Sequence, residues 1–156
     1  MTSTREGFDG DVRLIYRFTD ECWNGGDVGL VPELVAEDCR HHDRVFPYMA
    51  PGPASLQRLI ERVRRAFPDV KITIVETIGE GDHVKVRWNA TATQAAEFLG
   101  IAGKRRFASI PGTSIYRIEG GKIVENWMKW DVMSLMAQLL GVTPAGREGE
   151  HWRRAG

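Results

Sequence analysis

The spacing of apolar residues changes near Pro68, and this change constrains the fold more than any other feature of the chain. Before this proline, apolar residues recur every three to four positions, as on one face of a helix. After it, they alternate with polar residues, as in a strand with one buried face. Helices followed by a run of strands predict an α+β fold, and the short turns between the strands favour antiparallel pairing.

Two stretches before Pro68 carry the clearest helical pattern. The first ends at Asn24-Gly25-Gly26, where glycine permits a helix C-cap, and the second covers residues 55–67. A shorter helical face is expected at residues 30–35, and a strand at residues 39–46. The apolar stripes of the two main helices are Val12, Ile15, Phe18 and Cys22, and Leu56, Leu59, Ile60, Val63 and Phe67.

The second half predicts a meander of strands that ends in a helix. Strands are expected from residue 70 to the turn at 79–82, over residues 83–93, over 105–118 with a break at Pro111-Gly112, and over 122–131. A strongly bent sheet with helices on its concave face leaves a cone-shaped space, and ligand pockets favour such concavities.

Composition limits what such a domain can do. A chain of 156 residues suits one domain, which we expect at residues 1–142, followed by a loose tail at 143–156. The 21 basic and 21 acidic residues give zero net charge, which argues against nucleic acid and anionic membranes as partners. No apolar run reaches the roughly 18 residues of a membrane span, so we expect a soluble cytoplasmic protein. Cys22 and Cys39 form neither a disulfide framework nor a zinc cluster.

Asp131 and the His41-His42-Asp43 cluster carry the candidate chemistry. Asp131 lies where the last strand meets the last helix, so it either supplies an acid/base at the mouth of the cone or caps that helix. Adjacent histidines on a strand point to opposite faces, so at most one enters a pocket, and no metal site is expected. One histidine facing a carboxylate would be a workable acid/base pair, whereas both could also sit at a wet strand edge.

Aromatic residues on the last strand bear on the walls of a pocket. Residues 123, 125, 127, 129 and 131 share one parity and 124, 126, 128 and 130 the other, and the pattern does not decide which set faces the cone. Either choice places a tryptophan inside, Trp127 or Trp130. The sequence contains no glycine-rich phosphate loop and no Gly-x-Ser-x-Gly motif, which argues against a nucleotide or serine-hydrolase site.

An ordered series of short motifs over approximately residues 11–141 resembles the SnoaL-like polyketide cyclases and ester cyclases. The resemblance implies a barrel-like α+β cone, a homodimer packed through the outer sheet face, an apolar pocket and no cofactor. It also implies that Asp131 is a general acid/base for intramolecular aldol closure. The motifs are Asn24-Gly25-Gly26-Asp27, Leu34, Asp38, His42, Ala66-Phe67-Pro68-Asp69-Val70, Gly81-Asp82-His83-Val84, Arg87-Trp88, Glu97-Phe98-Leu99-Gly100, Tyr116-Arg117-Ile118, the segment 121–127, Asp131 and Gln138-Leu139.

The chain also departs from this family. Many relatives carry Gly-Thr-His where this chain has Ala92-Thr93-Gln94, and a histidine expected in the stretch 112–115 is missing. The aldol apparatus is therefore incomplete, which leaves several reactions open. The expected site residues are Asp131 and His42 as the catalytic groups, Trp88 and Trp127 as walls, and Tyr16 and Tyr48 as hydrogen-bond donors.

The leading hypothesis is a cofactor-independent cyclase or isomerase that acts on an apolar, polyketide-like small molecule of secondary metabolism, such as antibiotic biosynthesis. The alternatives are an epoxide-opening hydrolase or ring-former and a non-catalytic small-molecule-binding module. An inward second carboxylate within reach of Asp131 would favour epoxide chemistry.

Overall fold

The computed structural model describes residues 2–142, and the side chains of residues 7–142. The tail expected at 143–156 lies outside the described residues. Among the described residues, no helix is both long and apolar enough to cross a membrane. The helices are α1 (Thr2–Arg17), which continues into the π-helix η1 (Phe18–Asn24), the 3-10 helix η2 (Val28–Leu30), α2 (Val31–Leu34), α3 (Pro53–Ala66) and α4 (Val132–Leu140).

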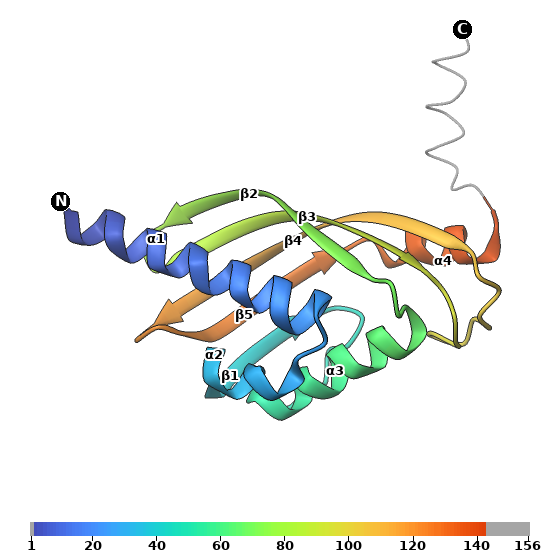
Figure 1. Cartoon of the computed structure of the whole chain (residues 1–156), viewed down its shortest axis with the longest axis horizontal. Coiled ribbons are helices and arrows are strands. Elements are labelled where there is room, and N and C mark those ends of the chain that lie inside the picture. The colour runs from blue at the N-terminus through green and yellow to red at the C-terminus, as the bar shows by residue number, and fades with distance from the viewer. Residues whose placement is uncertain (1, 143–156) are drawn as a thin grey trace, which may run out of the picture.

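Five strands form one sheet in the order β1-β5-β4-β3-β2. They are β1 (Val35–Asp43), β2 (Lys71–Glu80), β3 (His83–Thr93), β4 (Phe107–Glu119) and β5 (Lys122–Trp130). Strands β2 to β5 pair antiparallel, and β1 pairs parallel with β5 (Figure 1). The predicted α+β class with a mostly antiparallel sheet is confirmed.

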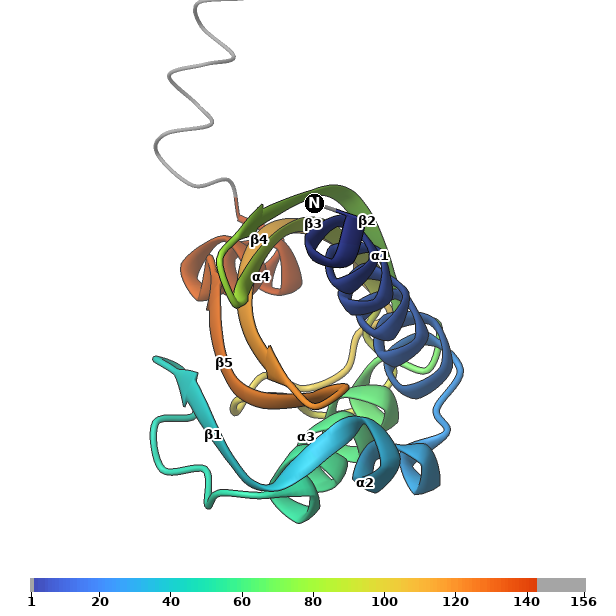
Figure 2. The same cartoon turned by 90° about the vertical axis from the view of Figure 1, so that its left-hand side faces the viewer.

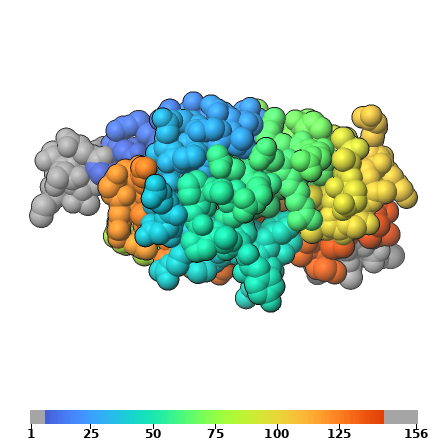
Figure 3. Space-filling model, turned by 90° about the horizontal axis from the view of Figure 1, so that it is seen from below, coloured from blue at the N-terminus to red at the C-terminus, as the bar shows by residue number. Residues whose placement is uncertain are grey.

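The sheet curls around its helices. Figure 2 looks along the molecule and shows the strands curving from β2 round to β1, with α1 and α3 on the open side. The α3 stripe predicted from spacing is buried at Leu56, Leu59 and Ile60, which join a core that includes Val84 and Val86 of β3. Figure 3 shows α3 and the segment that follows β1 side by side, with the loop of residues 94–106 at one end.

Two strand predictions need correction. The strand predicted at residues 39–46 runs instead from Val35 to Asp43 as β1. The break predicted at Pro111 is also wrong, because β4 continues through it. β5 ends at Trp130, which lies opposite Gly112, so no residue of β5 lies opposite Pro111. The N–H that proline lacks therefore costs no hydrogen bond to β5.

His41 ties the segment after β1 to the sheet. Its Nδ1 lies 2.7 Å from Nδ2 of Asn126, which can only donate, so Nε2 carries the proton and donates it to the Gly52 carbonyl at 2.8 Å. Gly52 has φ +103°, and a Cβ there would lie 2.7 Å from the Glu37 carbonyl oxygen. Burial lowers the pKa of His41, aided by the nearby His42 and opposed by the bond to Gly52.

We predict that His41 makes the protein less stable in mild acid. Its pKa in the folded chain lies below the ordinary value of about 6.5, so on acidification the unfolded chain binds a proton first. Stability should therefore fall as the pH drops below about 6.5. Urea unfolding of wild type and His41→Gln, measured between neutral and mildly acidic pH, should give a stability difference that shrinks with acidification. A difference that does not change with pH would contradict this role.

Candidate active site

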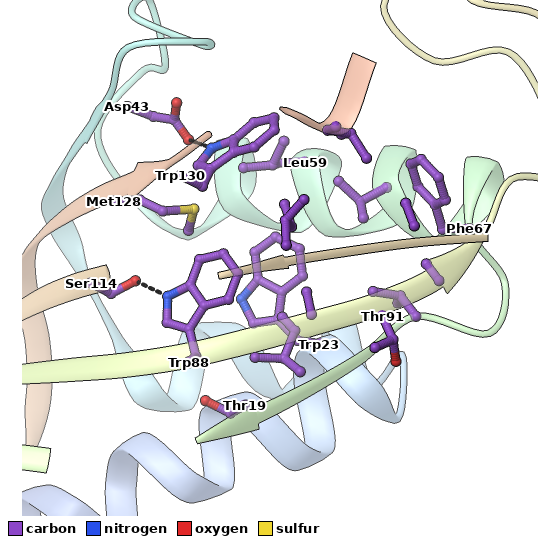
Figure 4. Close-up of a pocket in the computed structure, with 18 of the residues that line it drawn as sticks. Thr19, Trp23, Asp43, Leu59, Phe67, Trp88, Thr91, Ser114, Met128 and Trp130 are labelled. Atoms are coloured by element: carbon purple, nitrogen blue, oxygen red, sulfur yellow. Dashed lines mark hydrogen bonds between the residues drawn. The ribbon is translucent and has the colours of Figure 1, made fainter. Parts of the chain in front are cut away.

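The concave face of the sheet and the helices η1 and α3 form the walls of a partly open, apolar cavity of about 110 Å³. Thr19 and Trp23 of η1 and Leu59 and Val63 of α3 line one side. The inward residues of strands β2 to β5 line the other, together with Phe67 and Phe98 from the connecting segments (Figure 4). Its few polar groups therefore stand out against walls of aliphatic and aromatic side chains.

Four cavity residues form a row across four strands. Asp43 of β1 pairs with Met128 of β5, which pairs with Ser114 of β4, which pairs with Val86 of β3. All four line the cavity. Neighbouring strands lie about 4.8 Å apart, so the backbones of Asp43 and Ser114, two strands apart, are separated by about 10 Å.

A second row runs beside it and consists of Trp130, Gly112 and Trp88. Each indole N–H donates to a polar group of the first row, from Trp130 to Oδ2 of Asp43 at 3.3 Å and from Trp88 to Oγ of Ser114 at 3.0 Å (Figure 4). Gly112 leaves room between them, because a Cβ there would lie 2.1 Å from Cζ2 of Trp88.

Asp43 is the only carboxylate among the described residues that line the cavity. Its side chain is buried, and Oδ1 accepts the backbone N–H groups of Val45 at 2.7 Å and Phe46 at 3.4 Å. The sequence analysis named this residue in the His41-His42-Asp43 cluster but gave it no role of its own. A signal was present, because Asp43 has the parity of Cys39, which suits a buried face, and alternates with Arg40 and Arg44.

Two hydroxyl groups in the cavity can donate hydrogen bonds. Burial raises the pKa of Tyr116 to about 12, with an opposing effect of Ser114, so its phenol stays protonated at neutral pH. Ser114 is buried, and its oxygen already accepts from Trp88, which leaves its own proton for the neighbouring Tyr116 oxygen or for a bound substrate. The cavity thus combines one carboxylate with neutral donors.

Two aromatic rings that line the cavity come from separate connecting segments. Phe46 and Phe98 meet edge to face with centroids 6.4 Å apart, and the Arg62 guanidinium lies 5.3 Å and 5.8 Å from their centroids. Gln94, fully buried, holds the loop that carries Phe98 by donating to the carbonyls of Ala96 and Ile101. Gln94 therefore has a structural function here.

Asp131 lies outside this cavity. It is exposed, and its Oδ1 accepts the Ser134 N–H at 2.9 Å as the N-cap of α4. It borders a separate groove with Arg87, Thr113 and Lys129, residues that alternate with those lining the cavity. This is the capping role that the sequence left open beside the catalytic one.

His42 and Trp127 also lie on the outer face of the sheet. Their rings stack with centroids 5.2 Å apart, and Nε2 of His42 lies 2.6 Å from Oε2 of Glu125. Oε1 of Glu125 accepts from Arg40 and Arg117, both at 3.2 Å. Burial raises the pKa of Glu125, but the bonds from His42 and Arg117 outweigh it, so this pKa lies below its usual range.

Of the other residues expected to contact a substrate, one lines the cavity and two do not. Trp88 lines the cavity, whereas Tyr16 is largely exposed and Tyr48 is 97% exposed, and neither tyrosine lines the cavity. No three His, Cys, Asp or Glu side chains of the described part of the chain are grouped to hold a metal ion.

The model of the SnoaL-like polyketide cyclase family matches residues 13–139, and the chain belongs to this family. No curated protein matches the sequence of this chain. Among solved structures, TsrD of Streptomyces laurentii superimposes with a TM-score of 0.77 at 24% identity, covering 84% of this chain and 95% of that one.

Other similar structures differ in the activities proposed for them. IdmH of Streptomyces antibioticus, a proposed polyketide cyclase, has a TM-score of 0.71 at 28% identity over 84% of this chain and 98% of its own. AclR of Streptomyces galilaeus, a proposed hydroxylase, has a TM-score of 0.72 at 24% identity over 84% of this chain and 96% of its own. The shared fold therefore does not fix the reaction.

We predict that Asp131 acts as a cap only. Asparagine caps a helix about as well as aspartate, so Asp131→Asn should keep stability within about 1 kcal/mol and turnover within about threefold. Asp131→Ala, which removes the cap, should lose about 1 kcal/mol. Thermal melts and turnover measurements check both variants, and a loss of about 10²–10⁴-fold in the asparagine variant would restore Asp131 as an acid/base.

Proposed function

We propose that this protein is a cofactor-independent cyclase or isomerase that acts on an apolar, polyketide-like intermediate of secondary metabolism. The observation that carries the proposal is the aromatic-lined cavity with a single carboxylate and neutral hydroxyl donors, in a chain of the SnoaL-like polyketide cyclase family. Such a site would act by folding the substrate and by moving a proton.

The small cavity supports folding of the substrate as part of catalysis. Its volume of about 110 Å³ is below the roughly 150 Å³ that holds benzene, so a polyketide-like chain would either extend beyond the pocket or need wall side chains to move apart. Phe46 and Phe98, which come from separate connecting segments, are the natural groups to move. Closure behind the substrate would then press it into a compact shape and exclude water.

The distribution of carboxylates favours cyclisation over epoxide opening. Activation of water or of a substrate hydroxyl together with protonation of the epoxide would use two acidic groups, but Asp43 is the only cavity carboxylate among the described residues. Proton transfer next to a carbonyl needs one such group and neutral donors. A non-catalytic binding module is the remaining alternative, and turnover separates it from the enzyme.

The proposed function is tested with the purified protein and the linear intermediates that its neighbouring biosynthetic genes imply. We expect conversion to a cyclic or isomeric product without added cofactor, at a rate that chelator treatment leaves unchanged. Saturable binding without conversion of any such intermediate would favour the binding module instead.

We predict that Trp88 determines the product and Trp127 does not. Trp88→Ala removes a cavity wall and the N–H held by Ser114, so the rate should fall by about tenfold or more and the product ratio should change. Trp127→Ala, the matched control on the outer face, should keep the product ratio. Product analysis by chromatography checks both variants, and an unchanged ratio in Trp88→Ala would reduce that residue to core packing.

We also propose a homodimer through the outer face of the sheet. This face carries opposite charges, such as Arg87 with Glu76, beside the half-buried Trp127 and Ile115, and a two-fold contact can match each charge to its opposite.

We predict that light scattering at micromolar concentration gives twice the 17.5 kDa mass of the chain. A stable dimer should bury at least about 1,200 Å². Ile115→Arg places a charge within this face and should give a monomer that melts cooperatively. A monomeric wild type would refute the dimer.

A further inference from the structure

We propose that Asp43 is the acid/base residue of the cavity and that Trp130 positions it. The proposal rests on the proposed function in that the substrate must bind in this cavity. It goes further by assigning the proton transfer to Asp43 of β1 rather than to Asp131 at the end of β5.

The hydrogen bonds of Asp43 leave one oxygen available. Oδ1 is occupied by the N–H groups of Val45 and Phe46, which fix the side chain at the end of β1. Oδ2 accepts one bond among the described residues, of 3.3 Å from the Trp130 indole. A carboxylate oxygen has lone pairs for more than one donor, so Oδ2 retains capacity to accept a proton from a substrate.

Burying a carboxylate lowers the stability of the fold unless hydrogen bonds or an ion pair compensate for the lost water. Asp43 is only 8% exposed, and it lies among apolar side chains such as Met128 and Phe46. Its donors are two backbone amides and an indole, and no Lys, Arg or His side chain of the described residues makes an ion pair or hydrogen bond with it. The bonds of Oδ1 to the Val45 and Phe46 amides explain why this position is polar, since an apolar residue could not accept them. A chemical role would explain Oδ2, whose one hydrogen-bond donor among the described residues is the Trp130 indole.

The row that joins Asp43 to Ser114 bears on which substrates could use both groups. The backbones of Asp43 and Ser114 lie about 10 Å apart, with Met128 between them. A chain with two carbonyl groups fits, with an acidic C–H at Asp43 and the accepting carbonyl at Ser114. The two reacting carbons would meet above Met128.

The chemistry balances without a further reactant. Oδ2 of Asp43 takes the proton next to the first carbonyl, and the C–H electron pair forms the enolate. The enolate carbon attacks the second carbonyl carbon, forming the ring bond, while the carbonyl π pair moves to oxygen under a hydrogen bond from Ser114. Asp43 then returns its proton to that alkoxide through one bridging water molecule, which regenerates the carboxylate.

The test uses 5-nitrobenzisoxazole, a flat apolar probe that reports a base in an apolar site. The base removes the ring C–H proton, the C–H pair completes a nitrile, and the N–O bond breaks to give a coloured phenolate. Wild type should accelerate this elimination above an equal concentration of acetate. Asp43→Asn and Asp43→Ser, which retain an acceptor for the Val45 amide, should lower kcat/KM by roughly tenfold or more.

Asp38→Asn is the matched control, because Asp38 lies on the same strand with an exposed side chain. It should keep kcat/KM within about twofold of wild type. Quenching of tryptophan fluorescence by the probe should show that the Asp43 variants still bind it. No acceleration by wild type, or equal rates in wild type and the Asp43 variants, would overturn the proposal.

The positioning role of Trp130 is tested with Trp130→Phe, which keeps a ring in the wall and removes the N–H donor. The kcat for the probe should fall severalfold while KM stays within about twofold, because binding is retained and alignment is lost. A raised KM with unchanged kcat would show that Trp130 is only a wall.

The probe separates this proposal from the proposed function. Base catalysis that depends on Asp43, without conversion of any polyketide-like intermediate, would refute the proposed cyclase or isomerase function and support Asp43 as the base. Conversion of such an intermediate by Asp43→Asn at the wild-type rate would refute Asp43 as the base and support the proposed function.

Discussion

The cavity depends on the absence of a side chain at Gly112. This residue lies between Trp88 and Trp130 on neighbouring strands, and a methyl group there would overlap the Trp88 ring. With that space free, the Trp88 indole can lie across β4 and reach Ser114 on the same strand. Glycine in a strand weakens it by lowering packing and raising chain entropy, so its presence in a central strand is explained by this close approach.

The two indole N–H groups offset the desolvation of the polar groups that face the apolar walls. A carboxylate and a hydroxyl facing such a cavity would lose their water without replacement, and each unsatisfied group would cost about 1–3 kcal/mol. Trp130 and Trp88 supply the missing donors while their rings still contribute apolar surface. The same side chains therefore build the wall and hold the polar groups at fixed points, which is what a reaction that depends on substrate folding requires.

The fold could be predicted from the sequence because local patterns decided it. The helical stripe of residues 55–67 and the alternation after Pro68 each reflect burial on one face, and the structure confirms both. The face of β5 that points inward could not be predicted, since alternation gives two equal choices and only packing of the whole sheet selects Trp130 over Trp127. The cap at Asp131 depended likewise on where β5 ends and α4 begins.

The outer face shows why residue types alone mislead in the search for a site. His42 and Glu125 form a close acid–base pair beside Trp127, which are the components that a sequence search seeks. Glu125, however, is held by two guanidinium groups that stabilise its charge and lower its pKa, and such a carboxylate is a poor proton acceptor. Asp43 lines a mainly apolar cavity, and its hydrogen-bond donors among the described residues are uncharged. β1 thus presents His42 to the outer face of the sheet and Asp43 to the cavity. The surroundings of these groups, rather than their residue types, make Asp43 the one suited to proton transfer.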